Sequence, residues 1–206
     1  MPNWCSNMLQ VSSAGETNSG EQLDSFLAKY GKGFTFSKVK PIPEDFAGVH
    51  SGYTTIDGVP FSFWREIVNE AGERKSVGVS EEEVASWKER HGAAGWYDWC
   101  NANWGTKWDI EASDFEEVSK GDYQISFDTA WAPPEGVIET LSKEFPALSF
   151  SLYYCEPGCS FAGVDVYEDG CLADRNDTGD MEEARGISDW HDNQLSYMDE
   201  LDEEEV

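Results

Sequence analysis

The chain has 206 residues, 39% of them hydrophobic, and carries 41 acidic against 14 basic residues, a formal net charge of −27 at pH 7. This length suffices for one large domain or for one domain with a sizeable insertion, and no apolar run approaches the roughly 20 residues of a membrane span. The charge argues against direct binding of nucleic acid, because phosphate binding requires Lys and Arg, and favours a basic partner, a cation or simple solubility.

The first forty residues predict half of a ferredoxin-like fold. Residues 4–11 alternate apolar and polar, which predicts a strand with Leu9 toward the core and Trp4 on the opposite face. Residues 21–30 carry apolar side chains at helical spacing, and residues 34–39 alternate again as a second strand. Together these elements predict a βαβ unit.

An insertion is predicted next, at about residues 46–104. Residues 62–71 have apolar side chains at helical spacing. Ser80 and Glu83 can satisfy each other's backbone amides at the start of a second helix, and residues 96–103 are expected to form a third. We therefore predict a helical insertion between the two halves of the fold.

The second half is predicted to resume the pattern. Residues 107–115 and 121–130 read as two strands, Pro133-Pro134 begins a helix, and residues 148–154 and 160–167 form a closing hairpin. The predicted fold class is α+β, a ferredoxin-like antiparallel or mixed sheet with helices packed on one face.

Five of the nine tryptophans lie between Trp96 and Pro134. Aromatic side chains are the largest apolar groups that a chain can bury, so this block predicts the structural centre, with Trp104 and Trp131 mostly buried. A base-stacking platform is the alternative for these tryptophans. Core packing is preferred because few basic residues accompany them.

Three separated blocks also resemble a known family. They are Met1-Pro2-Asn3-Trp4-Cys5-Ser6-Asn7, Trp96–Asp109 and Thr129-Ala130-Trp131-Ala132-Pro133-Pro134. In this order they resemble the YubB-type family of uncharacterised phage and conjugative-plasmid proteins. The resemblance spans roughly residues 1–40 and 96–168, and residues further on lie outside it. It implies a ferredoxin-like domain and a mobile-element origin, and it supplies no catalytic residue.

The C-terminal part differs in composition. Residues 164–206 hold 16 acidic and 2 basic residues, so we predict a ferredoxin-like domain over residues 1–168 and an acidic segment over residues 169–206. Residues 174–184 have too few apolar residues to fold on their own. Residues 187–201 mix apolar side chains with acids, which is typical of an amphipathic helix that docks on the body or on a partner.

Little in the sequence indicates metal or cofactor chemistry. The odd number of cysteines predicts free thiols, and Cys5 and Cys100, each beside a tryptophan, are expected to be buried. Cys155 and Cys159 lack the second pair or nearby His that a zinc site requires. The acids after Asp165 lack the Gly and terminal Glu of an EF-hand loop. We expect no metal and no cofactor, and a cytoplasmic protein, because no signal-peptide pattern opens the chain.

Two functional hypotheses remain. The preferred one is a phage or plasmid inhibitor of a host defence complex, such as CRISPR or restriction machinery, which mimics DNA with carboxylates and blocks a basic nucleic-acid-binding site. The alternative is an enzyme with a site around Trp96–Asp109, for example a nucleotide-modifying activity. The residues expected to contact the partner are Asp165, Glu168, Asp169, Asp189, Trp190, Asp192, Tyr197, Asp199, Glu200 and Asp202.

Overall fold

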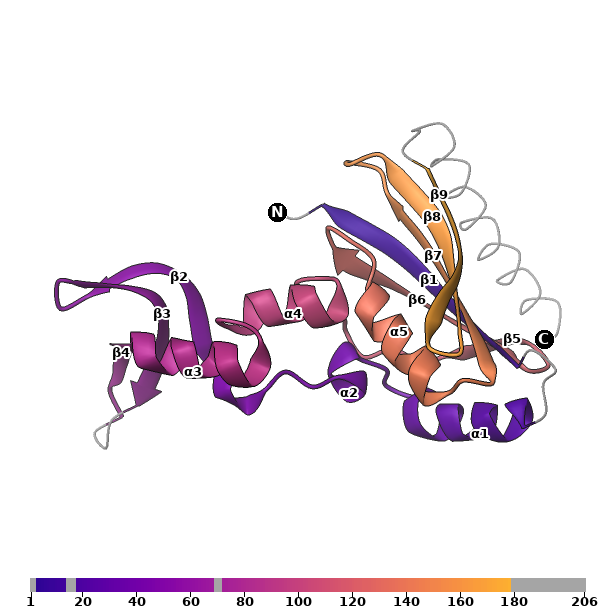
Figure 1. The fold of residues 1–206 in the computed structure, drawn as a ribbon, viewed down its shortest axis with the longest axis horizontal. Helices are drawn as coiled ribbons and strands as arrows, with labels where there is room; N and C mark the ends of the chain where they lie inside the picture. Colours follow the sequence, from indigo (N-terminus) through magenta and orange to yellow (C-terminus); the bar gives the residue numbers. More distant parts are fainter. Residues whose placement is uncertain (1–2, 14–17, 69–71, 179–206) are drawn as a thin grey trace. The chain divides into compact units, whose positions relative to one another are not determined.

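The computed structural model describes residues 3–13, 18–68 and 72–178 (Figure 1). The chain divides into two compact units. The first unit contains residues 1–39 and 104–206, and the second is Lys40–Asn103.

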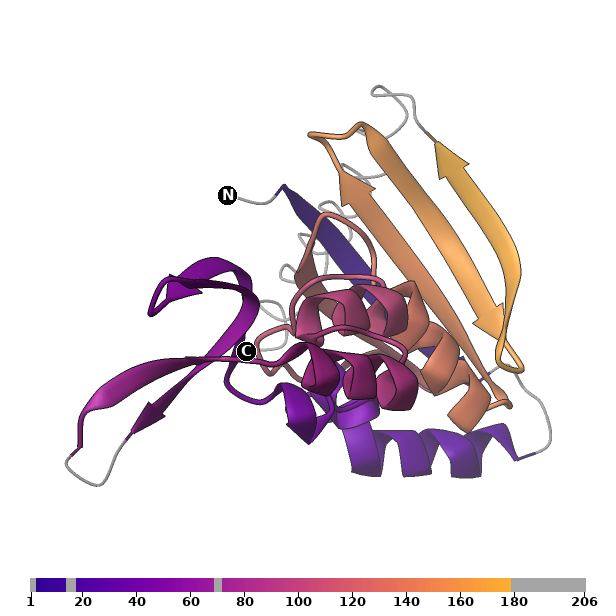
Figure 2. The same cartoon turned by 60° about the vertical axis from the view of Figure 1, so that its left-hand side comes forward.

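The first unit is built on a six-stranded sheet in the order β5-β6-β1-β7-β8-β9, in which every neighbouring pair is antiparallel. The strands are β1 (Trp4–Ser13), β5 (Glu116–Ser119), β6 (Asp122–Ala130), β7 (Leu148–Glu156), β8 (Phe161–Glu168) and β9 (Cys171–Thr178). The two long helices α1 (Ser19–Tyr30) and α5 (Glu135–Glu144) lie on one side of the sheet (Figures 1 and 2). The predicted α+β class is confirmed.

The chain path gives the β–α–β–β–α–β succession of a ferredoxin-like fold. It runs through β1, α1, β5, β6, α5 and β7, while β8 and β9 extend the sheet beyond β7. The second unit is therefore inserted into the first crossover, between α1 and β5. The sequence pattern predicts the insertion after the second strand of the fold instead, because it predicts that strand over residues 34–39.

Residues 34–39 contain the four-residue helix α2 (Phe36–Val39) and no strand. The carboxylate of Asp109 accepts hydrogen bonds from the backbone N–H groups of Phe36 (2.7 Å) and Ser37 (3.1 Å). These are free N–H groups at a helix start, which a carboxylate satisfies well. The strand prediction failed because the capping group lies more than 70 residues away in the sequence.

Residues 107–115, predicted as a strand, are irregular apart from a single bridge between Ser113 and Phe34. The carboxylates of this segment accept hydrogen bonds from backbone N–H groups of other segments. In a strand with one polar face they would point to solvent instead. Asp114 accepts from the N–H of Gly33 at 2.7 Å and from the ammonium of Lys32 at 2.9 Å. The hydrogen bond from Gly33, followed by that from Lys32, lowers the pKa of Asp114.

An aromatic cluster fills the space between the sheet and the helices. The ring of Phe26 on α1 lies 5.2–5.8 Å from four other aromatic rings, and Trp104 is fully buried against Phe36. The prediction for Trp104 is confirmed. That for Trp131 is wrong, because 48% of its surface is exposed. Its backbone turns at φ 74° directly after β6, so its side chain leaves the alternation of that strand.

The sheet continues beyond residue 168, the predicted end of the ferredoxin-like domain. Residues 171–178 form the edge strand β9, which pairs with β8. A polar strand can be ordered in this position because its neighbour supplies the ladder hydrogen bonds. Residues 179–206 lie outside the described residues.

The second unit contains a three-stranded antiparallel sheet. Its strands are β2 (Val49–Ile56), β3 (Val59–Val68) and β4 (Arg74–Gly78) in the order β2-β3-β4, accompanied by the 3-10 turn η1 (Glu44–Phe46) and the helices α3 (Glu81–His91) and α4 (Trp96–Trp104). The helix predicted over residues 62–71 is wrong for residues 62–68, which belong to β3, and residues 69–71 lie outside the described residues. The missed signal is Asp57-Gly58, where both residues have positive φ and which is the strongest short-range sign of a hairpin.

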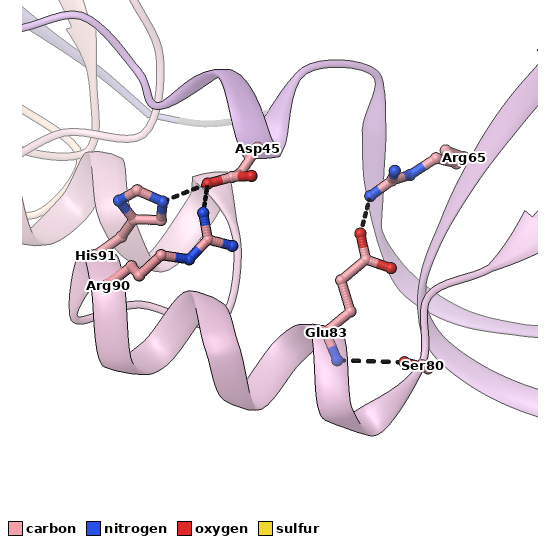
Figure 3. A network of polar contacts seen from close by, with 6 residues as sticks. All are labelled: Asp45, Arg65, Ser80, Glu83, Arg90 and His91. Carbon is pink, nitrogen blue, oxygen red and sulfur yellow. Dashed lines mark hydrogen bonds and ion pairs between the residues drawn. The ribbon is translucent and has the colours of Figure 1, made fainter.

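Helix α3 begins at the predicted Ser80 cap and ends at His91. The hydroxyl of Ser80 accepts from the N–H of Glu83 at 3.2 Å, and Gly92 follows with φ 72°. A network of charged side chains surrounds this helix (Figure 3). The carboxylate of Asp45 meets Arg90 at 2.5 Å and His91 at 2.6 Å, and Arg65 meets Glu83 at 2.8 Å.

The network gives a testable pH response at Asp45. The hydrogen bond to His91, together with the charge of Arg90, holds the pKa of Asp45 below its ordinary value. A carboxyl with a lowered folded pKa contributes stability that is complete above its unfolded pKa and is lost as the pH falls through the folded pKa. We expect His91→Ala to raise the pKa of Asp45, as followed by carbon NMR titration of the carboxyl.

Lys88→Ala is the matched control for that titration, because Lys88 is a cation of the same helix for which the described structure records no bond to Asp45. The control is expected to leave the midpoint close to that of the wild type. An Asp45 midpoint that is the same in His91→Ala and in the wild type would contradict the assignment.

Candidate protein-binding surface

Three segments that are far apart in the sequence meet at one end of the sheet of the first unit. The side-chain amide of Asn7 donates to the hydroxyl of Thr129 at 2.8 Å. The hydroxyl of Thr106 donates to the carbonyl of the last residue of β6 at 2.9 Å, and the N–H of Trp131 donates to the carbonyl of Asn3 at 3.0 Å. All three segments come from the blocks that carry the family resemblance.

Part of this corner serves the fold itself. Asn7, Thr129 and Thr106 are buried, and their hydrogen bonds satisfy groups that would otherwise be costly to bury. Gly105 has φ 88°, and a Cβ there would lie 2.9 Å from the carbonyl oxygen of Pro133. Any larger residue at this position would be strained. These residues need no functional explanation.

The exposed tryptophans of the same corner are not explained by core packing. We call Trp4, Trp108 and Trp131 the tryptophan corner; their exposed fractions are 51%, 38% and 48%. The rings of Trp4 and Trp108 lie 6.2 Å apart between centroids. Tryptophan is the residue most enriched among those that dominate binding energy at protein interfaces. Three of them in one region of a small domain therefore indicate a binding surface.

Carboxylates lie beside one member of the tryptophan corner, Trp4. A shallow groove of about 420 Å³ runs beside Trp4, and its walls include Asp109, Glu111 and Asp128. Asp109 is engaged with the start of α2, and Asp128 accepts a hydrogen bond from Ser6 at 2.9 Å. Glu111 and Asp128 are exposed, so they present negative charge beside the exposed ring of Trp4.

The corner already holds one cation against an aromatic face. The ammonium of Lys107 lies 4.2 Å from the centroid of the Trp108 ring, within the range of a cation–π interaction. Exposed indole rings flanked by carboxylates suit Lys and Arg side chains of a partner, because the ring face and the carboxylate both attract positive charge.

The predicted contact residues divide into three groups. Asp165 is fully buried and forms bonds of 2.8 and 2.5 Å with Arg175, so its prediction as a partner contact is wrong. Glu168 and Asp169 are exposed at the end of β8. The other predicted contacts lie outside the described residues: Asp189, Trp190, Asp192, Tyr197, Asp199, Glu200 and Asp202.

The two thiols that were predicted to be buried give no nucleophile at this corner. Cys5 and Cys100 are buried as predicted, and burial raises the pKa of Cys5 to about 12. A thiol with such a pKa is not ionised near neutral pH. Within residues 3–13, 18–68 and 72–178, no group of three or more His, Cys, Asp or Glu side chains could hold a metal ion.

Only part of the signal for the tryptophan corner is present in the local sequence. The alternation of residues 4–11 placed Trp4 on the face away from the core, and this is confirmed. Trp108 and Trp131 were assigned to the core because aromatic density alone cannot distinguish buried from exposed rings. The turn that exposes Trp131 depends on its contact with Asn3, which is not local in the sequence.

Comparison with known proteins agrees with the topology. Residues 103–204 match the model of a family described as the ferredoxin-like domain in Api92-like protein. The chain carries the ferredoxin-like domain of Api92-like proteins. This Api92-like domain reaches residue 204, so the expectation that the family resemblance stops near residue 168 is wrong.

Two individual proteins are similar to the chain. An uncharacterized protein YubB of Escherichia coli K12 is 36% identical over 85 residues, which cover 38% of this chain and 54% of that protein. The chain thus spans about half the length of the curated relative, and the resemblance to the YubB-type family is confirmed. A crystal structure of a protein api92 from Yersinia pseudotuberculosis aligns with a TM-score of 0.43 at 13% identity, covering 86% of this chain and 98% of the other.

In the part of the chain that the structure describes, no helix has both the length and the apolar character needed to cross a membrane.

Proposed function

We propose that this Api92-like protein is an acidic binding protein that inhibits a nucleic-acid-handling complex of a bacterial host, such as CRISPR or restriction machinery. It occupies the basic surface on which the complex binds DNA, as a gene product of a phage or plasmid. The observation that carries this proposal is the tryptophan corner, three exposed indole side chains on a chain of net charge −27, with carboxylates in the walls of the groove beside Trp4.

Charge and apolar contact act at different stages of such binding. Residues 1–178 alone carry 30 acidic and 13 basic residues, so the charge is not confined to the C-terminal segment. Long-range attraction speeds the encounter with a basic surface, while fully desolvated aromatic side chains slow dissociation. No observation on the described residues favours the alternative of a nucleotide-modifying enzyme.

The proposal predicts the effect of removing two indole rings. In the double variant Trp4→Ala/Trp108→Ala, we expect affinity for the captured partner to fall by at least about tenfold, the usual effect of losing interface tryptophans. Affinity is measured by surface plasmon resonance with the partner captured from host lysate. Tyr53→Ala is the matched control, because Tyr53 is an aromatic residue of the second unit that is 81% exposed.

Two further measurements decide whether the partner has the proposed chemistry. Duplex DNA should release the captured partner, and association should slow steeply with rising salt. The protein itself should give no gel shift with DNA or RNA at about 150 mM salt. Equal affinity of the double variant and the wild type, or a partner that DNA does not release, would refute the proposal.

A further inference from the structure

The second unit contains a groove between β3 and α3, which we call the β3–α3 groove. Its volume is about 620 Å³, and most of the residues in its walls are apolar. The strand supplies Phe61 and Phe63, and the helix supplies Val84 and Ala85. A concave, largely apolar site of this size is typical of places where a protein binds a ligand or a peptide.

The β3–α3 groove lies beside a strand edge that has no neighbour. β4 pairs with β3 over residues 64–68 of β3 only. Residues 59–61 pair with β2 on one side. On the other side of residues 59–62, no strand is present in the part of the chain that the structure describes. An extended peptide can add to such an edge as a further strand.

Two glycines fix the aromatic walls of the groove. A Cβ at Gly78 would lie 2.2 Å from the ring of Phe61, and a Cβ at Gly95 would lie 2.7 Å from the ring of Phe63. Each ring therefore packs directly against backbone. The centroid of the Phe63 ring also lies 6.3 Å from that of Trp87, in an edge-to-face arrangement. Walls that are already fixed reduce the ordering cost of binding.

Helix α3 gives the groove a charge at each end. Glu81, Val84, Ala85 and Lys88 follow the spacing i, i+3, i+4 and i+7, so they share the helix face that lines the groove. Glu81 and Lys88 are both exposed. Seven residues of a helix rise about 10 Å, which is the length of about three residues of an extended chain.

We propose that the β3–α3 groove binds an extended segment of a partner protein, which adds as a strand along residues 59–62 of β3. Apolar side chains at alternate positions of the segment enter the groove. A Lys or Arg of the segment meets Glu81, and an Asp or Glu about three positions away meets Lys88. Pro60 offers only its carbonyl to the added strand, so the apolar walls contribute to affinity together with the ladder hydrogen bonds.

A second copy of this chain is a poorer occupant of the groove. Its net charge of −27 repels another copy. The proposed site belongs to the second unit, and none of its residues is part of the tryptophan corner. Peptide binding in the groove is therefore a separate property from the proposed binding at that corner.

Selection from a library of short random peptides displayed on phage particles tests the groove, with the full chain as bait. We expect the enriched peptides to carry alternate apolar side chains and the spaced basic and acidic residues. Ala85→Gln should weaken the binding of an enriched synthetic peptide by about tenfold or more, because the larger side chain obstructs the groove. Fluorescence polarisation with the labelled peptide measures the affinity.

Ala102→Gln is the matched control. It makes the same substitution at an exposed position of α4 that does not line the groove, and it should leave the affinity unchanged. Glutamine is a good helix former, so both variants should keep their fold. If no enriched peptide binds Ala85→Gln more weakly than Ala102→Gln, the groove is not the peptide site and the proposal is overturned.

The charged end of the groove has its own matched pair. Glu81→Gln should weaken the same peptide about two- to fivefold, the usual value of an exposed ion pair. Glu89→Gln removes an exposed carboxylate of the same helix that does not line the groove, and it should have no effect. Equal effects of the two substitutions would contradict the contact with Glu81.

Methylation of peptide nitrogens decides whether the bound segment is extended. An added strand directs alternate N–H groups toward β3 and the others away from it. Methylating one alternate set should therefore weaken binding by about tenfold or more, while methylating the other set should be tolerated. Equal losses for the two sets would overturn strand addition.

Two further measurements separate the groove from other binding modes. The double variant Trp4→Ala/Trp108→Ala should bind the peptide as the wild type does, since those residues lie in the first unit. Sedimentation of the chain without peptide should show no dimer that Ala85→Gln dissociates. Such a dimer would identify a second copy as the occupant and would overturn the proposal.

Discussion

Replacing Trp104 with alanine is expected to lower the free energy of unfolding by about 3–5 kcal/mol, the usual range for truncating a large core side chain. Trp104 is fully buried, and its ring lies 5.8 Å from that of Phe36. The cavity would open beside Phe36 of α2, and the loss of stability grows with the volume that the surrounding residues leave unfilled. Urea unfolding followed by circular dichroism measures the change.

Trp131→Ala is the matched control for that measurement. It also truncates a tryptophan, but one whose side chain is 48% exposed. Substitutions at the surface usually change the free energy of unfolding by no more than about 0.5 kcal/mol. A destabilisation by Trp131→Ala as large as that by Trp104→Ala would mean that the tryptophan corner is part of the core. The case for a binding surface would then fail.

Arg175→Met is expected to destabilise the protein by about 3–5 kcal/mol, because it leaves the buried carboxylate of Asp165 without its cation. Asp165 is fully buried, and besides Arg175 only the hydroxyls of Tyr154 (3.3 Å) and Tyr167 (3.5 Å) lie within bonding distance in the described structure. Burial, together with the charge of Asp165, raises the pKa of both tyrosines.

Substitution of the other partner, Asp165→Asn, should lower the free energy of unfolding by less, about 1–3 kcal/mol. Arg175 keeps an ion pair with Glu135 at 3.1 Å and part of its contact with solvent. Arg74→Met is the matched control, because Arg74 is an arginine in an exposed pair with Glu66 at 3.4 Å, and such pairs contribute about 0–1 kcal/mol. Equal losses for Arg175→Met and Arg74→Met in urea unfolding would show that Asp165 is not dependent on its partner.

Local sequence patterns predicted most regular elements of the first unit. β1, α1, α5, β6 and the β7–β8 hairpin follow from apolar periodicity that is continuous within each segment, and from turn or cap residues at their ends. The capped helix α3 of the second unit was predicted for the same reason. In these elements the local preference and the tertiary environment agree.

The errors fall where a distant group decides the local conformation. Residues 34–39 alternate like a strand, but Asp109 caps them as a helix. Residues 62–68 lie in a segment of helical spacing, but pairing with β2 and β4 holds them extended. Short apolar runs fit both periods, so their own sequence cannot choose between helix and strand.

The sequence by itself determined the net charge, the α+β class and the three blocks that mark the family. Only the tertiary structure decided which acids and which tryptophans face solvent. Strand register places Arg175 opposite Asp165 and removes that carboxylate from the surface, and the turn after β6 brings Trp131 out of the core. Whether a side chain is buried depends on which segments folding brings against it. The residue type alone gives only the average burial of that kind of side chain.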